Sequence, residues 1–478
     1  MNPSDIHVTS MPGLLIGVLL LTAVITYLLR GWERVTAIIG AAVTAGLAIW
    51  LWPTDPGALS RPLASGWMLI DVGDSLQRLG FTLRMEAGAI PILAVSLGLV
   101  AVSFILAANV SQGRSFVPFA LALTAGYVVL ALVTVGPLAP SLIVPLLLAV
   151  LAASGVFVLQ AGRSVSASGP LRSLFPPLLA FPLFLLASWY IEQMPLNPQD
   201  LSPAYASAQL MALGLIILLA PMPLHGAMPL VSKNSPPIAA ALLTLLYQLA
   251  VLHLIFRAVT TFQFMAQFAP LGVWLTWAGL LTAVWGGFAG AGARNAGRLV
   301  GYSSMHDWGL IVLVLAVPGS RSWPLVLFLF GLRTISLMTA SAGMAVLEQN
   351  TGGLDRANLQ GAGSRMPWNS AAFLIGGLGL TGFPLSAGFT GHWAALQIVA
   401  ETDWRPAAVV LIASAGAILG YVRLARVLFG PLENRTMPRE NSFNIAIAVT
   451  ALIVSISFAM APQLLDLPIS RALVAFSQ

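Results

Sequence analysis

The chain has 478 residues, of which 58% are hydrophobic and 8% are charged. Soluble domains carry about 25% charged residues, so this composition excludes a soluble protein and predicts a surface covered mostly by lipid. The sequence contains no cysteine, which excludes disulfides, thiolate metal sites and iron–sulfur clusters. The net charge of +6 comes from basic residues scattered singly between apolar runs, a pattern that indicates membrane topology rather than binding of nucleic acid.

The apolar runs predict an all-α, polytopic membrane protein. A membrane-spanning helix needs about 20 mostly apolar residues, and by this measure we expect about fourteen spans. Their expected ranges are 12–29, 35–52, 88–108, 116–135, 138–160, 174–191, 207–224, 236–256, 270–291, 299–317, 323–347, 367–393, 404–428 and 443–461. The first run is followed by Arg30 and Glu33 instead of a small-residue cleavage site, so we expect a retained helix and not a signal peptide.

The distribution of basic residues between the loops predicts the orientation. One set of loops contains 14 basic residues, namely Arg30, Arg34, Arg114, Arg163, Arg172, Lys233, Arg294, Arg298, Arg356, Arg365, Arg423, Arg426, Arg435 and Arg439. The other contains 7, namely Arg61, Arg78, Arg84, Arg257, Arg321, Arg405 and Arg471, while Arg333 lies inside a span. The richer side is expected to be cytoplasmic, which with an even number of spans places both termini outside.

Two of the expected spans contain helix breakers. Pro221 and Pro223 interrupt the seventh span, and Gly382 and Pro384 interrupt the twelfth. An odd offset of five spans means that the two run in opposite directions through the membrane. Paired broken helices in inverted repeats are a pointer to an ion or substrate path in transporters. The alternative interpretation is that prolines are simply frequent in membrane helices.

Several motifs in order resemble one family. Residues 223–229 (PLHGAMP), 298–304 (RLVGYSS), 365–367 (RMP), 380–391 (LTGFPLSAGFTG) and 421–423 (YVR) resemble segments of the antiporter-like membrane subunits of respiratory complex I. The same family includes subunits of multisubunit cation/proton antiporters and of membrane-bound hydrogenases. The chain ends soon after the fourteenth span, so it looks like the N, M or antiporter D type. The resemblance covers spans three to fourteen.

The resemblance implies a division of the chain into four parts. These are N-terminal transmembrane helices (1–108), a first inverted five-helix repeat (109–258), a second inverted repeat (259–430), and a C-terminal transmembrane helix and tail (431–478). It also implies the bacterial inner membrane as the location and other membrane subunits of a hetero-oligomeric complex as partners, beside the lipid bilayer. We expect no nucleic-acid partner, no cofactor and no metal site.

The ionisable residues depart from the family pattern. The resemblance implies a buried glutamate in the fifth helix and lysines in the seventh, eighth and usually twelfth. This chain has no acidic residue between Glu86 and Glu192, and its one lysine, Lys233, is expected in the connection after the seventh span. Ungapped matching places Leu218 at the seventh-helix lysine position, Gln248 at the eighth and His392 at the twelfth.

A sparser set of polar residues remains as candidates for a proton path: His225, Gln248, His253, His306, Asp307, Arg333 and His392. Histidine can relay protons because its unperturbed pKa is near 6.5. Arginine does not deprotonate, but it can stabilise a neighbouring carboxylate. We predict an Arg333–Asp307 pair, because an unpaired intramembrane charge is costly. The alternative for each histidine is a structural hydrogen bond between helices.

Four functions follow from this sequence. The first is a membrane-arm subunit of a complex I-like oxidoreductase that still conducts protons, and the second is a subunit of the same assembly that acts as a non-pumping spacer. The third is a subunit of a sodium/proton antiporter, and the fourth is an independent solute transporter. The sequence predicts no catalytic site of its own, so any redox reaction of an NADH/quinone-type or hydrogenase-type complex belongs to partner subunits.

Overall fold

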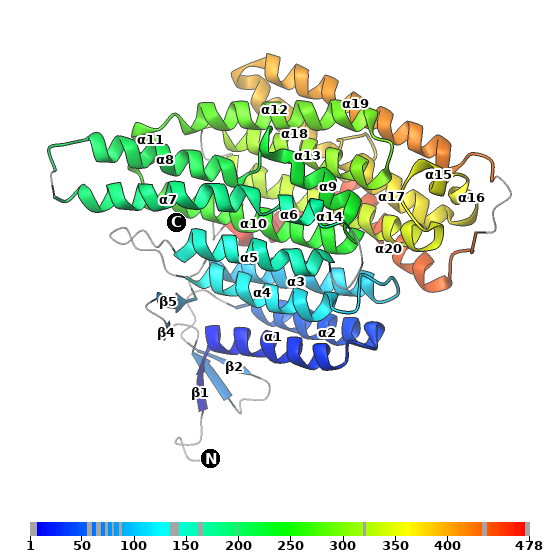
Figure 1. The fold of residues 1–478 in the computed structure, drawn as a ribbon, viewed down its shortest axis with the longest axis horizontal. Coiled ribbons are helices and arrows are strands. Elements are labelled where there is room, and N and C mark those ends of the chain that lie inside the picture. The colour runs from blue at the N-terminus through cyan, green and yellow to red at the C-terminus, as the bar shows by residue number, and fades with distance from the viewer. Residues whose placement is uncertain are drawn as a thin grey trace.

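The structure is a computed structural model that describes residues 7–54, 60–63, 68–71, 75–78, 81–85, 88–133, 143–160, 166–196, 198–318, 322–432 and 437–473. Its helices lie side by side in one bundle and run roughly along the same direction (Figure 1). The helices of the N-terminal half are α1 (Met11–Leu28), α2 (Glu33–Leu51), α3 (Ala89–Ala107), α4 (Phe116–Leu132), α5 (Ile143–Gln160), α6 (Ser168–Arg172), α7 (Phe175–Gln193) and α8 (Ser202–Leu218).

The remaining helices include two short 3-10 turns, η2 and η3. They are η2 (Leu224–Gly226), α9 (Ala227–Asn234), α10 (Pro237–Thr261), α11 (Phe264–Phe268), α12 (Leu271–Gly292), α13 (Ala296–Leu315), α14 (Ser322–Thr351), α15 (Arg356–Leu359), α16 (Ala362–Arg365), α17 (Pro367–Gly379), α18 (Phe389–Thr402), α19 (Trp404–Leu428), α20 (Ser442–Met460), η3 (Pro462–Leu465) and α21 (Asp466–Leu473).

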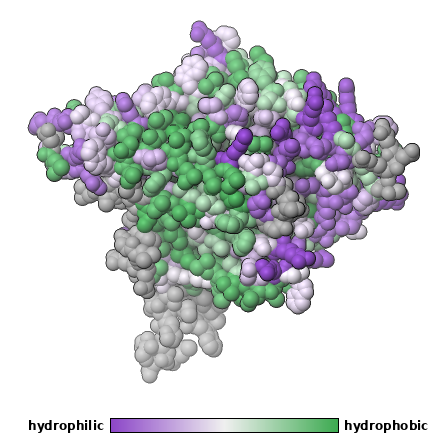
Figure 2. All heavy atoms as spheres, in the orientation of Figure 1, coloured by the Kyte–Doolittle hydropathy of each residue, from purple (hydrophilic) through white to green (hydrophobic). Residues whose placement is uncertain are grey.

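Each predicted span overlaps a helix of the structure, and the all-α polytopic fold is confirmed. Ten of the described helices are long and apolar enough to cross a bilayer. Two further apolar helices, α4 and α8, have 17 residues each and fall just below that length. Figure 2 shows a broad apolar surface over the middle of the bundle and hydrophilic residues gathered near α15 to α17. This is the surface expected of an integral membrane protein.

The segment before α1 and the region between α2 and α3 contain short strands that the apolar pattern does not predict. Strands β1 (His7–Ser10), β2 (Ser60–Leu63) and β3 (Met68–Asp71) form one sheet, in which β3 pairs parallel with β1 and antiparallel with β2. Strands β4 (Ser75–Arg78) and β5 (Phe81–Arg84) form an antiparallel pair. Each strand has four residues, too short for an alternating pattern to stand out in sequence. Glu86 lies outside the described residues.

The first break separates α8 from α9. Helix α8 ends at Leu218, six residues before the predicted end of the seventh span, and Ala220 has a positive φ of 50°. After η2 the chain resumes as α9, whose last turn contains Lys233. The expectation that Lys233 lies in a connection was therefore wrong, because the segment after the prolines is helical.

The second break separates α17 from α18. The chain between Gly379 and Phe389 is not helical, and Gly382 (φ 69°) and Leu385 (φ 67°) adopt the left-handed conformation. Glycine takes this conformation without strain, which explains Gly382 at the break. Helix α18 continues to Thr402, beyond the expected end of the twelfth span at residue 393.

Helices α3, α10 and α14 are deeply buried in the bundle. In the most apolar stretch of each, 78%, 72% and 72% of the residues are buried, compared with 22% in α20. Helix α13 is buried over most of its length and packs closely on α12: a β-carbon at Gly286 of α12 would lie 2.5 Å from the backbone nitrogen of His306 in α13. Small residues at such crossings allow backbones to pack in lipid. The polar residues of α10, α13 and α14 therefore meet inside the bundle.

Candidate functional site

Arg333 of α14 is the centre of a buried polar cluster. Its guanidinium donates to Oδ2 of Asp307 (2.6 Å), to the carbonyl of Ser304 (2.7 Å), to Oγ of Ser304 (2.7 Å) and to Oε1 of Gln248 (2.9 Å). The side chain of Arg333 is completely buried, and that of Asp307 is 4% exposed. The predicted Arg333–Asp307 pair is confirmed, and it neutralises two charges that would be costly alone in the membrane.

Two helices, α10 and α13, supply these partners, which explains why one arginine can be satisfied there. Ser304 and Asp307 are three residues apart on α13, so they share one face of that helix. Gln248 comes from α10, and the Arg333 Cζ lies 5.7 Å from the ring centroid of Trp308. A guanidinium has five N–H donors in a planar fork, and a lysine could not make the same set of contacts.

His392 joins the cluster at the other carboxylate oxygen of Asp307. Its Nε2 lies 2.8 Å from Oδ1, and because a carboxylate only accepts, Nε2 carries the hydrogen. His392 lies in the first turn of α18, directly after the second break. A β-carbon at Gly382 would lie 2.5 Å from Nδ1 of His392, so the break itself packs against the imidazole. The broken helix thus positions this histidine.

His306 lies beside His392, with 5.9 Å between the ring centroids. Its Nδ1 contacts the carbonyl of Ala283 (2.7 Å) and must donate, since a carbonyl accepts only. Its Nε2 lies 2.9 Å from Oγ of Ser414, whose hydroxyl also lies 3.1 Å from the carbonyl of Val410. If the Ser414 hydroxyl donates to His306, the imidazole is neutral. If it donates to Val410, Nε2 must donate and the imidazole is a cation, so both charge states fit the same partners.

At the first break, uncharged side chains form hydrogen bonds with the freed backbone groups. Tyr247 donates its hydroxyl to the carbonyl of Leu218 (2.9 Å), and Trp308 donates its indole N–H to the carbonyl of Leu219 (2.9 Å). The backbone N–H of Met222 donates to Oγ1 of Thr282 (3.0 Å). Helix ends in a membrane need such partners because lipid offers none. Leu218, the position that the resemblance assigns to a lysine, therefore contributes a capped carbonyl.

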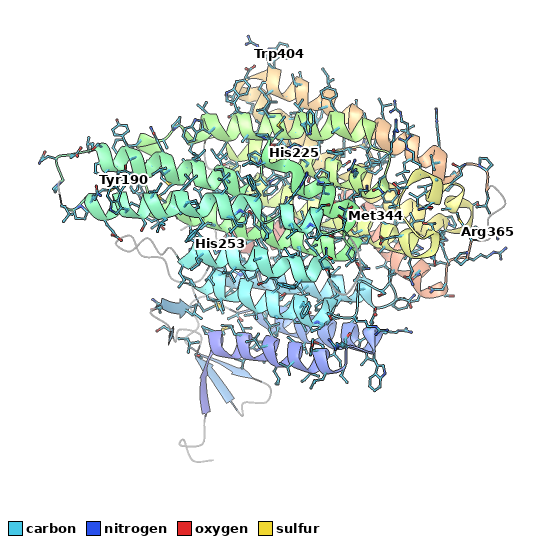
Figure 3. The ribbon with its side chains drawn as sticks, in the orientation of Figure 1. Tyr190, His225, His253, Met344, Arg365 and Trp404 are labelled. Atoms are coloured by element: carbon cyan, nitrogen blue, oxygen red, sulfur yellow. The ribbon has the colours of Figure 1, made fainter. Side chains whose placement is uncertain are left out.

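His225 and Gln248 line one cavity of about 90 Å³ at the first break. Nδ1 of His225 is buried and has no hydrogen-bond partner among the described residues. Its ring lies 5.9 Å from the ring of Trp285, edge to face. Figure 3 places His225 near the middle of the bundle, and no described contact joins it to Arg333 or Asp307. The cavity is large enough for water, which needs about 10–15 Å³.

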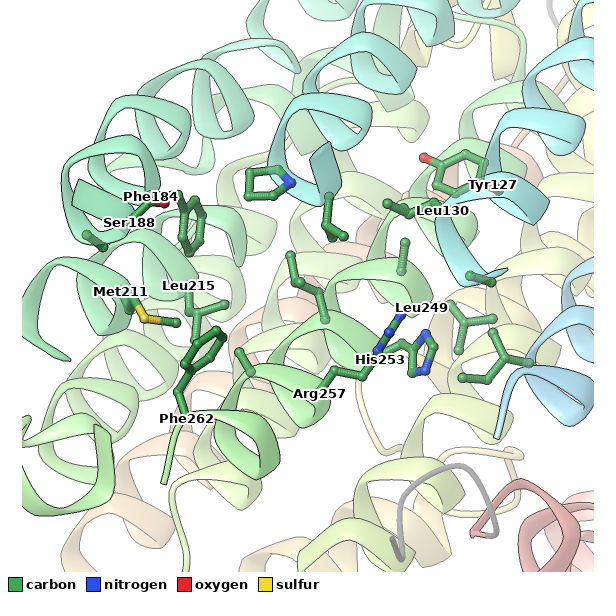
Figure 4. A pocket seen from close by; sticks show the side chains of 18 of the residues that line it. Tyr127, Leu130, Phe184, Ser188, Met211, Leu215, Leu249, His253, Arg257 and Phe262 are labelled. Carbon is green, nitrogen blue, oxygen red and sulfur yellow. The ribbon is translucent and has the colours of Figure 1, made fainter. Parts of the chain in front are cut away.

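His253 faces a second cavity of about 90 Å³. Arg257 lines it as well and donates to the carbonyl of Val133 (2.8 Å), and Figure 4 shows its side chain beside His253. Tyr127 lines both cavities. His253 thus lines a different cavity from Gln248, although it lies only five residues after Gln248 on the same helix. A step of five residues on a helix turns the side chain to another face.

Four members of the cluster are among the residues predicted from the sequence, and two of its serines are not. Gln248, Asp307, Arg333 and His392 come together, and His306 lies next to them. Ser304 and Ser414 were not among the candidates. The spacing of Ser304 to Asp307 could have suggested a shared face, whereas Ser414 lies more than 100 residues from its partner and carries no such signal.

These features are those of an antiporter-like membrane protein: a bundle of apolar helices, two broken helices and a buried polar cluster beside the second break. Residues 185–420 match the family of membrane domains described as NADH:quinone oxidoreductase/Mrp antiporter, TM, so this segment is similar to that membrane domain. All seven candidate residues lie within the matched segment.

Relatives and solved structures agree with this assignment. The chain is 28% identical over 284 residues to NADH-quinone oxidoreductase subunit N of Parafrankia sp. (strain EAN1pec), covering 57% of this chain and 53% of the relative. Its fold matches a chain of the archaeal membrane-bound sulfane sulfur reductase (TM-score 0.78, 19% identity, 98% of both chains). It also matches a chain of the Mrp complex from Dietzia sp. DQ12-45-1b (TM-score 0.77, 17% identity, 97% of both chains). The matched sequence spans about half the length of the curated relatives.

Proposed function

We propose that the protein is a membrane-arm subunit of a complex I-like oxidoreductase assembly and contributes to proton translocation through its second half. The observation that carries this proposal is the buried hydrogen bond between Asp307 and His392 at the second broken helix. Arg333 is a permanent cation and balances Asp307, and His392 brings to the other carboxylate oxygen an imidazole, a group that can accept and release protons at two nitrogens. His306 and Ser414 extend the same group of exchangeable sites.

The organisation around this site is part of the proposal. We infer that residues 109–258 and 259–430 form the two inverted repeats, flanked by N-terminal helices in 1–108 and a C-terminal helix in 431–478. One broken helix then falls in each repeat. The hydrogen bond between Gln248 and Arg333 joins the first repeat to the second. The excess of arginines on one side favours an orientation with both termini outside. The similarity to bacterial NADH-quinone oxidoreductase subunits N favours the bacterial inner membrane.

A non-pumping spacer is the second candidate. The observation that favours it is the set of four hydrogen bonds that fix Arg333, because this cation occupies one oxygen of Asp307 permanently. The lack of a lysine at Leu218 and Gln248 also favours it. In this case the cluster would serve as a structural bond between α10, α13, α14 and α18.

A subunit of a sodium/proton antiporter is the third candidate, supported by the likeness to the Mrp complex. The three candidates differ in partners and in ion dependence. The test is purification of the full assembly from membranes in mild detergent, identification of the co-purifying subunits, and reconstitution into vesicles. We expect redox subunits and proton release driven by electron transfer that does not depend on sodium. Redox subunits without any effect of this chain on proton release would select the spacer, and sodium-dependent proton movement without redox subunits would select the antiporter.

A further inference from the structure

A cavity of about 580 Å³ lies at the end of the bundle where α17 and α20 begin. Its lining combines basic, aromatic and apolar side chains, including Arg365, Arg439, Glu440, Trp368, Leu432 and Ile445. Figure 3 shows Arg365 extending away from the helices at this end, and Figure 2 shows hydrophilic residues gathered there. The cavity is separate from the polar cluster in the membrane centre.

Two arginines line this cavity, Arg365 and Arg439. Within the described parts of the chain, neither guanidinium has a hydrogen bond or an ion pair. Glu440 lines the cavity as well, and its Oε1 accepts from the backbone N–H of Asn369 (2.8 Å) and from its side-chain amide (2.9 Å). Glu440 thus caps the start of α17, and no ion pair with either arginine is seen among the described residues.

The charge and shape of the lining favour a phosphate diester with an apolar tail. Two arginines and one glutamate give a net charge of +1, which one phosphodiester would balance. Arginine binds phosphate oxygens with paired N–H donors. Trp368 is 47% exposed at a helix end, where aromatic side chains mark the level of lipid headgroups, and Leu432 and Ile445 offer apolar contact beside it.

We propose that this cavity binds the headgroup of an anionic phospholipid, held by Arg365 and Arg439. The arginine-rich end of the bundle is the one for which we infer a cytoplasmic position, and anionic lipids of that leaflet attract basic residues near the surface. Bound lipid would link the start of α20 to the start of α17. At the start of α20, Cζ of Arg34 from α2 lies 5.4 Å from the ring centroid of Phe443.

The test measures binding of lipid to the full chain in mild detergent, by native mass spectrometry and by the unfolding temperature. The probes are phosphatidylglycerol, phosphatidylcholine and inorganic phosphate. We expect phosphatidylglycerol to bind and to raise the unfolding temperature, and the other two to do neither. Arg365→Gln with Arg439→Gln should weaken phosphatidylglycerol binding by about 30-fold, since each basic residue near an anionic surface contributes about fivefold.

Arg426→Gln is the matched control, because it removes an exposed arginine from the last turn of α19 outside the cavity. Arg426→Gln should leave the affinity for phosphatidylglycerol unchanged. The double substitution should not alter the response to phosphatidylcholine. If the double variant unfolds before lipid is added, Arg439→Gln alone, at an exposed residue, should still weaken binding about fivefold. Unchanged phosphatidylglycerol affinity in the variants would overturn the proposal. Equal stabilisation by inorganic phosphate would overturn it in favour of a free anion.

Discussion

Both broken helices of this protein interrupt the helical backbone inside the bundle, but different kinds of side chain contact the two breaks. At the first break the freed carbonyls of Leu218 and Leu219 are capped by Tyr247 and Trp308. At the second break His392 contacts Asp307, and His306 lies beside it. The freed carbonyls of the first break are thus capped by groups that stay neutral, and His225 there has no described contact with another ionisable group, while the second break brings an acid and two imidazoles together. The two breaks therefore differ in whether ionisable groups contact one another beside them.

The largest effect is expected from Asp307→Asn in the second half. This change leaves the Arg333 cation buried without a counter-ion, which costs about 3–5 kcal/mol of unfolding free energy. The unfolding temperature in detergent measures it. Combining it with Arg333→Gln should restore part of the loss, whereas Asp403→Asn at an exposed site should have little effect. An unchanged unfolding temperature in the single variant would show that Arg333 has another counter-ion.

Gly382→Ala should have the next largest effect, because it acts on both the backbone and His392. The residue has a φ of 69°, and a β-carbon would press on the imidazole of His392. A loss of about 1–3 kcal/mol is expected for a strained position of this kind. Gly98→Ala is the control, since nothing lies within 4 Å of a β-carbon there. Equal stability of both variants would mean that the second break does not hold His392 in place.

A loss of stability no larger than that of Gly382→Ala is expected at the first break. Tyr247→Phe removes the donor to the carbonyl of Leu218 and leaves a buried acceptor unpaired, at a cost of about 1–3 kcal/mol. Proton movement in the assembled complex should not change beyond the loss of folded protein. A specific loss of proton movement at full folded yield would contradict the neutral role given to this break.

The smallest change in stability is expected from Ser414→Ala. It removes the partner that fits both charge states of His306, at a cost of about 1 kcal/mol, and Ser414→Thr should restore that partner. The informative readout is the pH profile of coupled proton movement, which a purely structural role would not shift. A profile identical to that of the unchanged protein would exclude His306 as an exchangeable site.

The sequence predicts the scaffold of this site better than its details. The apolar runs and breakers locate the helices and both interruptions, and the cost of a lone charge in lipid predicts the Arg333–Asp307 pair. The rotation of each central helix is not predictable in this way, because helices buried among others are apolar on nearly all faces. This is why the separation of His253 from Gln248 and the contact between His306 and Ser414 emerge only from the structure.

The most direct test compares two histidine variants in the assembled complex, reconstituted in vesicles. His392→Gln alters the second break and His225→Gln the first, and both replace an imidazole by a neutral side chain that still forms hydrogen bonds. We expect fewer protons moved per electron for His392→Gln and an unchanged ratio for His225→Gln, at equal subunit content. An unchanged ratio for His392→Gln, or an equal loss in both variants, would contradict this expectation.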